Sequence, residues 1–128
     1  MTQLADITVK NGAATPVDTL FTAVEPQSGS TPALWYFKAA ESRNSYVRLT
    51  TDVRRSGSNA STKSKMQLNF PIVDATTGLV KYTLIAKMEL TVPDMATQQN
   101  VNDAYAWMKN LIAHAHLQGN FKDLSASL

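Results

Sequence analysis

Three consecutive stretches of the chain alternate between apolar and polar residues, and this pattern most limits what the chain can fold into. The stretches span residues 46–55, 63–73 and 79–92. Successive side chains of a β-strand point to opposite sides, so a period of two predicts strands with one apolar and one polar face. We therefore expect an antiparallel sheet that the rest of the protein covers on one side only.

The two sets of residues separate cleanly along all three stretches. The apolar set contains Val47, Leu49, Val53, Met66, Leu68, Phe70, Leu84, Ala86, Met88, Leu90 and Val92. The polar set contains Arg48, Thr50, Asp52, Arg54, Lys63, Lys65, Gln67, Asn69, Lys87 and Glu89, with Ile85 among them as an apolar member. Because each set has the same parity along its strand, we expect each to occupy its own face of the sheet.

The polar face is also locally basic, although the net charge of the chain is only +2. Between residues 43 and 65 there are six basic residues and a single acidic one, Asp52. Local basicity indicates an anionic partner, and lysine and arginine together with Thr50, Gln67, Asn69 and Glu89 suit the phosphates and base edges of RNA. A solvated outer face with scattered charges is the other interpretation of the same pattern.

The flanking segments predict a hairpin before the sheet and helices after it. Residues 4–10 and 19–24 read as two strands around an Asn11-Gly12 turn, and residues 33–39 read as a third strand. The adjacent aromatics Trp35, Tyr36 and Phe37 suit either base stacking or, as is commoner for such runs, a core or subunit contact. After Pro93 the period becomes helical, with Thr97 as N-cap, a helix to about Leu117 and Gly119 as its stop. Residues 120–128 are expected to form a final turn or short helix.

These elements describe a single α+β domain of 128 residues without cysteine. One apolar helical stripe is too small to cover the apolar face of the predicted sheet. The stripe consists of Val101, Ala104, Tyr105, Met108, Leu111, Ile112 and Ala115. A second copy of the chain would supply the missing cover, so we expect an obligate dimer, in which Trp107, which lies off the stripe, meets a neighbouring subunit or another part of the sheet.

The sequence contains no arrangement of residues that is typical of an enzyme. His114 and His116 are the only histidines, and two positions along a helix separate their side chains by about 200°, which prevents a shared metal site. The chain has no glycine-rich phosphate loop or nucleophile elbow. It also has no secretory signal and no apolar run long enough to cross a membrane. We expect no cofactor, no membrane partner and no small-molecule substrate.

Several segments resemble the coat proteins of single-stranded RNA bacteriophages of the levivirus type. The resemblance is carried by residues 87–93 (KMELTVP) with Ala96-Thr97, by residues 46–54 (YVRLTTDVR), by residues 67–71 (QLNFP) and by the opening segment 4–12. It implies an N-terminal hairpin (4–24), a five-stranded antiparallel sheet (33–92) and two C-terminal helices (97–128). It also implies an interlocked homodimer in which two chains form one ten-stranded sheet and each covers the other's sheet with its helices.

The resemblance further implies a function. Such proteins are made in the cytoplasm of the bacterial host and assemble into an icosahedral shell, T=3 in geometry, around the single-stranded RNA genome of the virion. A hairpin of that genome binds the inner sheet face, which represses translation of the replicase. A dimeric RNA-binding module without a viral role is the alternative, and it would form discrete dimers rather than shells.

The family's RNA-contacting positions fall on residues of the polar face in this chain. By the resemblance they are Arg48, Thr50, Asp52, Lys65, Gln67, Ile85, Lys87 and Glu89, to which the basic pattern adds Arg54 and Lys63. Three positions depart from well-known members. Ile85 stands where an aromatic residue stacks on a base, Gln67 where there is a lysine, and Lys87 where there is an asparagine-like hydrogen-bonding residue. The segment between Pro71 and Leu79, which shapes contacts around the symmetry axes in the family, is short.

Overall fold

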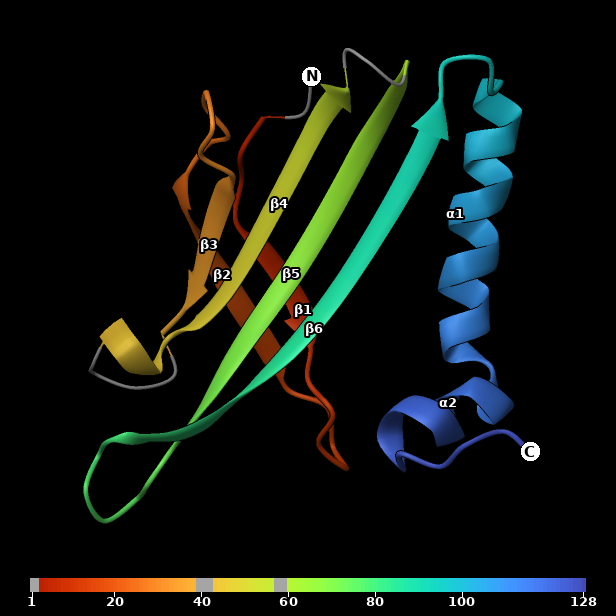
Figure 1. Ribbon diagram of the computed structural model, residues 1–128. Coiled ribbons are helices and arrows are strands. Elements are labelled where there is room, and N and C mark those ends of the chain that lie inside the picture. Colours follow the sequence, from red (N-terminus) through yellow and green to blue (C-terminus); the bar gives the residue numbers. More distant parts are fainter. Residues whose placement is uncertain (1–2, 39–42, 57–59) are drawn as a thin grey trace. The chain divides into compact units, whose positions relative to one another are not determined.

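A computed structural model of the chain describes residues 3–38, 43–56 and 60–128. Six strands form one antiparallel sheet in the order β1-β2-β3-β4-β5-β6, and two helices follow (Figure 1). The strands are β1 (Ile7–Lys10), β2 (Asp18–Glu25), β3 (Ala33–Phe37), β4 (Val47–Ser56), β5 (Ser61–Val73) and β6 (Val80–Pro93). A short 3-10 helix, η1 (Arg43–Ser45), precedes β4. The predicted α+β class is confirmed.

The register of β4 and β5 explains why the alternating pattern was informative. The two strands pair from Arg48 opposite Asn69 to Ser56 opposite Ser61, and Leu49 lies opposite Leu68. Directly opposite residues of neighbouring strands point to the same side of a sheet. The apolar and polar sets of β4 and β5 therefore lie on separate faces, as the sequence predicts.

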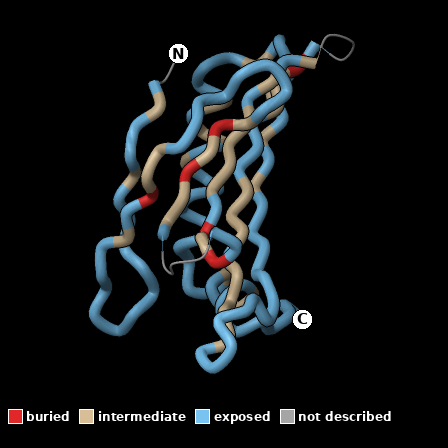
Figure 2. Tube along the Cα trace, turned by 90° about the vertical axis from the view of Figure 1, so that its left-hand side faces the viewer, coloured by how far each residue is buried: buried red, intermediate tan, exposed pale blue. Residues whose placement is uncertain are grey.

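The core lies on the apolar face where β2, β3 and β4 meet. Its buried residues are Phe21, Ala33, Trp35 and Val47, which appear as short red segments in Figure 2. The indole Nε1 of Trp35 donates a hydrogen bond to the carbonyl oxygen of Ala5 at 2.8 Å, which ties the N-terminal segment to β3. A buried indole N–H needs such a partner, so this contact lets the ring be buried without an unpaired donor.

Two details of the predicted sheet are wrong. We expect a hairpin and a five-stranded sheet, but the described residues between 33 and 92 form four strands, because β4, β5 and β6 are long, with 10, 13 and 14 residues. The expected two-residue turn at Asn11-Gly12 is a longer loop between Lys10 and Asp18. The side chain of Asn11 organises this loop by accepting hydrogen bonds from the amides of Ala13 at 3.2 Å and Val17 at 3.0 Å.

The chain divides into two compact units, Met1–Thr91 and Val92–Leu128, and the second contains the helices. Helix α1 (Gln98–Ala113) begins at the predicted N-cap, where Thr97 Oγ1 accepts from the amide of Asn100 and the Asn100 side chain accepts from the amide of Thr97. The helical backbone is interrupted at His114, and helix α2 spans Ala115–Lys122. Within the described residues, neither helix is long and apolar enough to cross a membrane.

The predicted end of the first helix is wrong. The expectation was one helix to about Leu117 with Gly119 as its stop, but α1 ends at Ala113 and Gly119 lies inside α2. The backbone of His114 is extended, with ψ at 138°, and its Nδ1 accepts a hydrogen bond from the amide of His116 at 3.1 Å. A side chain that satisfies a free amide in this way begins a new helix, which explains the break.

Candidate nucleic-acid interface

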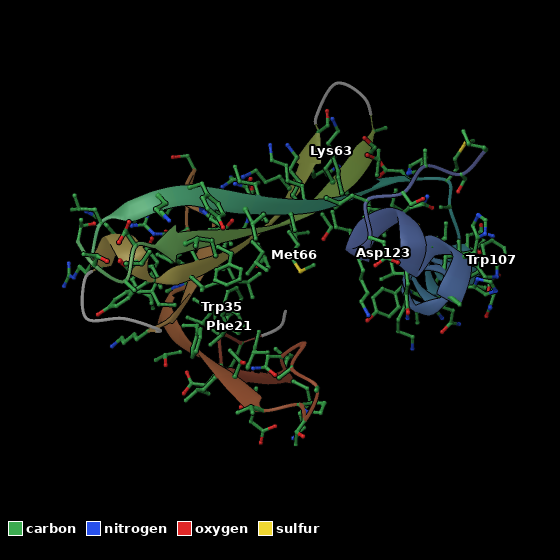
Figure 3. The ribbon with its side chains drawn as sticks, turned by 90° about the horizontal axis from the view of Figure 1, so that it is seen from below. Phe21, Trp35, Lys63, Met66, Trp107 and Asp123 are labelled. Carbon is green, nitrogen blue, oxygen red and sulfur yellow. The ribbon has the colours of Figure 1, made fainter. Side chains whose placement is uncertain are left out.

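Strands β4 and β5 bring together seven of the ten residues that the sequence assigns to RNA binding. Across the two strands, Thr50 lies opposite Gln67, Asp52 opposite Lys65 and Arg54 opposite Lys63, and Arg48 lies opposite Asn69. We call this side the polar face. Figure 3 shows Lys63 and Met66 on opposite sides of the sheet, with Trp35 and Phe21 on the side of Met66. The grouping of these residues on one face is a structural finding, and their role in RNA binding stays a prediction.

The end of the β4–β5 hairpin has a small basic hollow in the polar face. Its volume is about 190 Å³, and its lining consists of Asp52, Arg54, Arg55, Ser56, Lys63 and Lys65. Four of these six side chains are cationic and one is anionic. A concentration of positive charge in a concave surface attracts phosphate groups, so the hollow is the part of the polar face that is best suited to an anionic ligand.

Arg54 and Asp52 are already engaged with each other. The Nε of Arg54 lies 2.8 Å from each carboxylate oxygen of Asp52, and its Nη1 donates to the carbonyl oxygen of Gly29. The side chains of Arg54 and Asp52 are 40% and 26% exposed. Arg54 thus links β4 to the loop between β2 and β3. Part of its charge is neutralised by Asp52, and its Nε and Nη1 already donate hydrogen bonds to protein groups.

The same loop is held to β4 from a second point. The side-chain amide of Gln27 donates to the carbonyl oxygen of Val53 at 2.8 Å and accepts from the amide of Val53 at 2.9 Å. The pairing of β3 with β4 ends where Ala33 lies opposite Thr51. Gln27 therefore supplies hydrogen-bond partners to the backbone of Val53, which lies past the end of that pairing. This contact fixes the loop that receives the guanidinium of Arg54.

An aromatic and cationic cluster on the polar face was not assigned by the sequence pattern. The Cζ of Arg48 lies 5.6 Å from the ring centroid of Tyr36, and the rings of Tyr36 and Tyr46 are 5.4 Å apart and tilted by 57°. Tyr36 pairs with Arg48 across β3 and β4, whereas Trp35 is buried on the other face. Alternation within residues 33–37 was the signal that separates Tyr36 from its aromatic neighbours.

The three remaining predicted site residues lie on β6. Ile85, Lys87 and Glu89 have the same parity along this strand, so their side chains point to one side of it. All three are exposed. Among the described residues neither Lys87 nor Glu89 takes part in an ion pair or a side-chain hydrogen bond. Ile85 offers no aromatic ring, so the aromatic surface on this side of the sheet is formed by Tyr36 of β3 and Tyr46, the residue before β4.

The apolar face and the helices each leave large hydrophobic side chains in contact with solvent. On the sheet these include Val53, Met66 and Leu84, and a hollow of about 800 Å³ is lined in part by Ala33, Trp35, Thr51 and Val53. On the helices the exposed residues include Tyr105, Trp107, Met108, Leu111 and Ile112, and neither helix contains a buried residue. An exposed apolar area of this extent is typical of a protein–protein interface.

Each histidine makes a hydrogen bond to another protein group. His114 Nδ1 accepts from the amide of His116, and His116 Nε2 lies 3.0 Å from the hydroxyl of Ser127. No group of three or more candidate metal ligands occurs within residues 3–38, 43–56 and 60–128.

Comparison with protein families identifies one match that spans almost the whole chain. The model of the levivirus coat protein family matches residues 2–126. No curated protein sequence matches the chain.

The fold is also similar to those of solved phage coat proteins and virus-like particles. The chain is similar to the virus-like particle protein of bacteriophage NT-214, with 28% identity and a TM-score of 0.88 over 99% of this chain and 100% of that one. The virus-like particle of Beihai levi-like virus 21 follows, with 21% identity and a TM-score of 0.86 over 99% of both chains. The capsid protein of bacteriophage GA has 21% identity and a TM-score of 0.71 over 96% of both.

Proposed function

Since the chain belongs to the levivirus coat protein family, and is a capsid protein rather than an enzyme, we propose that its working unit is a dimer that binds single-stranded RNA. The observation that carries this proposal is the division of β4 and β5 into a basic face and an exposed apolar face. One face suits a polyanion and the other suits a second copy of the chain. The family membership removes the alternative of a module without a viral role.

The dimer follows from apolar surface that a single chain leaves uncovered. Met66 on β5 is 44% exposed and Ile112 on α1 is 51% exposed, although both belong to the apolar sets of their elements. In an isolated chain this surface would cost about 25 cal/mol for each Å² in contact with water. Helices of one chain that lie over the sheet of the other would bury both surfaces together, and solved relatives that form virus-like particles support self-association.

The RNA-binding role rests on the charge and shape of the polar face. Lys63 and Lys65 beside the basic hollow would neutralise phosphates, and Thr50 and Gln67 in the adjacent rows would donate and accept hydrogen bonds. The rings of Tyr36 and Tyr46 offer an aromatic surface for an unpaired base. These features suit a hairpin with an exposed loop, because its bases can leave the stack while its stem presents phosphates.

The dimer is in turn the building block of an icosahedral shell around the RNA genome. The virion location follows from the family and from the virus-like particles that its relatives form. We further propose that the chain is made in the host cytoplasm and that hairpin binding by the same face represses translation of the replicase. Both the packaged genome and the repressing hairpin would use the polar face, so the two activities would be lost together.

Expression of the chain alone in bacteria tests this function. We expect RNA-containing shells of uniform size, seen by electron microscopy. Their absorbance ratio at 260 and 280 nm should fall once the particles are disrupted, treated with nuclease and separated from the released nucleotides. Small soluble oligomers without shells would contradict the assembly role. Shells that form without nucleic acid, or that package as much RNA as before when Lys63 and Lys65 are changed to neutral residues, would contradict the RNA-binding role.

A further inference from the structure

The loop between β1 and β2 contains Asn11-Gly12, the only asparagine–glycine pair in the sequence. The loop spans residues 11–17, extends past the ends of both strands (Figure 1) and is exposed along its whole length. The other described asparagines lie in η1, β5, α1 and α2, and each is followed by a residue with a side chain. Asn11 therefore differs from them both in secondary structure and in steric access.

Backbone contacts fix the main chain and the side chain of Asn11 together. Its amide donates a hydrogen bond to the carbonyl oxygen of Val17 at 3.0 Å, and its Oδ1 accepts from the amide of Val17 at 3.0 Å. The same Oδ1 accepts from the amide of Ala13 at 3.2 Å. This last contact is an Asx turn, which closes a ring that contains both Cγ of Asn11 and the amide nitrogen of Gly12. The turn therefore holds these two atoms close to each other.

The amide of Gly12 is not engaged elsewhere. No group of the described residues accepts a hydrogen bond from it, and a Cβ at this position would meet no atom beyond its chain neighbours within 4 Å. Within the same described part of the chain, Nδ2 of Asn11 donates to no protein group. An unhindered nitrogen thus lies next to a carboxamide whose oxygen is held and whose amine can leave into solvent.

We propose that Asn11 is a site of spontaneous deamidation. The amide nitrogen of Gly12 gives up its proton and forms a bond to Cγ of Asn11, and the bond from Cγ to Nδ2 breaks with release of ammonia. Water then opens the resulting cyclic imide at either carbonyl, which leaves aspartate or isoaspartate at residue 11. The modification goes beyond the capsid role and does not depend on it.

The two amides that hold Oδ1 are placed to accelerate this reaction. Negative charge develops on Oδ1 of Asn11 during the attack, and the N–H groups of Ala13 and Val17 already donate to that atom. Preorganised donors of this kind stabilise an oxyanion, and in enzymes one donor is worth about 10²–10³ in rate. Water competes with the donors in an exposed loop, so we expect a smaller acceleration of about threefold to tenfold over the unfolded chain.

A second Asx turn in the chain serves as an internal control. The Oδ1 of Asp74 accepts from the amides of Thr76 at 2.7 Å and Thr77 at 3.2 Å, and Ala75 follows it. The hydrogen bonds resemble those of Asn11, but a carboxylate is a poor electrophile and the next residue has a Cβ. We expect residue 74 to remain unmodified while residue 11 reacts.

Comparison of the native and the unfolded chain tests the site and its acceleration separately. Native protein and the same chain in guanidinium chloride are incubated at one temperature and one mildly alkaline pH. Peptide mapping by mass spectrometry then follows the mass gain of the amide-to-acid conversion at residue 11. We expect the native rate to exceed the unfolded rate at least about threefold. A native rate equal to or below the unfolded one would overturn the role of the two amides, and a native chain that does not convert would overturn the site.

Variants of Val17 test the hydrogen bond to Oδ1 with a matched pair. Val17→Pro removes the N–H but keeps the carbonyl group, so the native rate should fall about threefold or more, towards that of the unfolded chain. Val17→Ala removes the side chain but keeps the N–H, and its rate should stay within about twofold of the natural chain. Equal slowing in the two variants would overturn the donor role. If Val17→Pro fails to fold, the comparison of the native and unfolded natural chain still decides.

Gly12→Ala tests the attacking nitrogen. The added Cβ hinders attack on Cγ of Asn11, so conversion should slow about tenfold in both the native and the unfolded state. Each conversion adds one negative charge, and isoelectric focusing of aged protein should therefore show an acidic band in the natural chain that is nearly absent in this variant. Asn11→Asp supplies the reference position of that band. An acidic band of equal strength in Gly12→Ala would overturn attack by the nitrogen of residue 12.

Discussion

The two faces of strands β4 and β5 are built from alternate residues of the same segments, yet they are held in different ways. On the apolar face, Trp35 of the neighbouring strand is 8% exposed and contacts a closed cluster with Phe21 and Val47. On the polar face, Lys63 and Lys65 have no ion pair with any described residue. Packing therefore fixes one face, whereas the other keeps its charges available to a ligand.

The two faces should therefore contribute to different properties, the apolar face to stability and the polar face to binding. Removing a buried ring leaves a cavity, whose cost includes the transfer free energy of the ring and its packing against neighbours. Removing an exposed lysine without an ion pair changes the free energy of unfolding little, because its charge is solvated in both states. Substitutions on the apolar face should thus change stability, and those on the polar face should change the affinity for RNA.

The largest expected effect is that of Trp35→Ala. We expect the free energy of unfolding to fall by about 3–5 kcal/mol, because the variant loses a buried aromatic ring and the hydrogen bond to Ala5. Urea unfolding followed by circular dichroism measures this change. Trp35→Phe keeps most of the ring but not the N–H, so its loss should be clearly smaller. A loss below about 1 kcal/mol for Trp35→Ala would mean that the cluster is not the core of the sheet.

A smaller effect, of a different kind, is expected from Lys63→Ala/Lys65→Ala on the polar face. The affinity for an RNA hairpin should fall about tenfold at moderate salt, or about 1.4 kcal/mol. The slope of log K against log salt should decrease by about 0.7 for each phosphate that the variant no longer neutralises. Filter binding or fluorescence anisotropy across a salt series measures both, and the urea midpoint should not change.

The matched control for this double variant removes the same charge elsewhere. Lys10 is on β1 and Lys109 is on α1, where its Nζ lies 5.9 Å from the ring centroid of Tyr105. Lys10→Ala/Lys109→Ala should therefore leave the salt slope close to that of the natural chain. Equal losses in the two double variants would show that RNA responds to net charge alone, and the distinction between the faces would then fail for binding.

The sequence predicted the two faces well because strand alternation is a local property. Once residues 46–55 and 63–73 were assigned as strands, the parity of each residue determined its face, and the register confirmed it. The N-cap at Thr97 was predicted for the same reason, since capping depends on three or four consecutive residues. The family resemblance is confirmed by a model that matches residues 2–126.

The predictions that failed depend on contacts between residues far apart in the sequence or on a residue in a role that its type rarely has. The break at His114 was missed because histidine is an uncommon N-cap, and only its contact with the amide of His116 shows that it begins α2. Tyr36 was grouped with Trp35 and Phe37 because the three are adjacent, although its pairing with Arg48 places it on the other face. The contact of Arg54 with Gly29 was not foreseen, because it joins segments 25 residues apart.

Arg54 combines properties of both faces, because it lies on the polar face but its guanidinium contacts other protein groups. Its Nε pairs with Asp52 and its Nη1 donates to the carbonyl oxygen of Gly29, an arrangement that needs the planar fork of arginine. Arg54→Lys keeps the charge but cannot make both contacts. We expect the free energy of unfolding to fall by about 1 kcal/mol, a modest loss because the side chain is partly exposed, while the affinity for RNA stays within about twofold. Urea unfolding and anisotropy on the same preparation measure the two quantities, with Lys63→Arg as a charge-conserving control on the opposite strand. Full stability with a large loss of affinity would instead place Arg54 among the residues that bind RNA, and the link from β4 to the loop at Gly29 would then have no measurable part in holding the sheet.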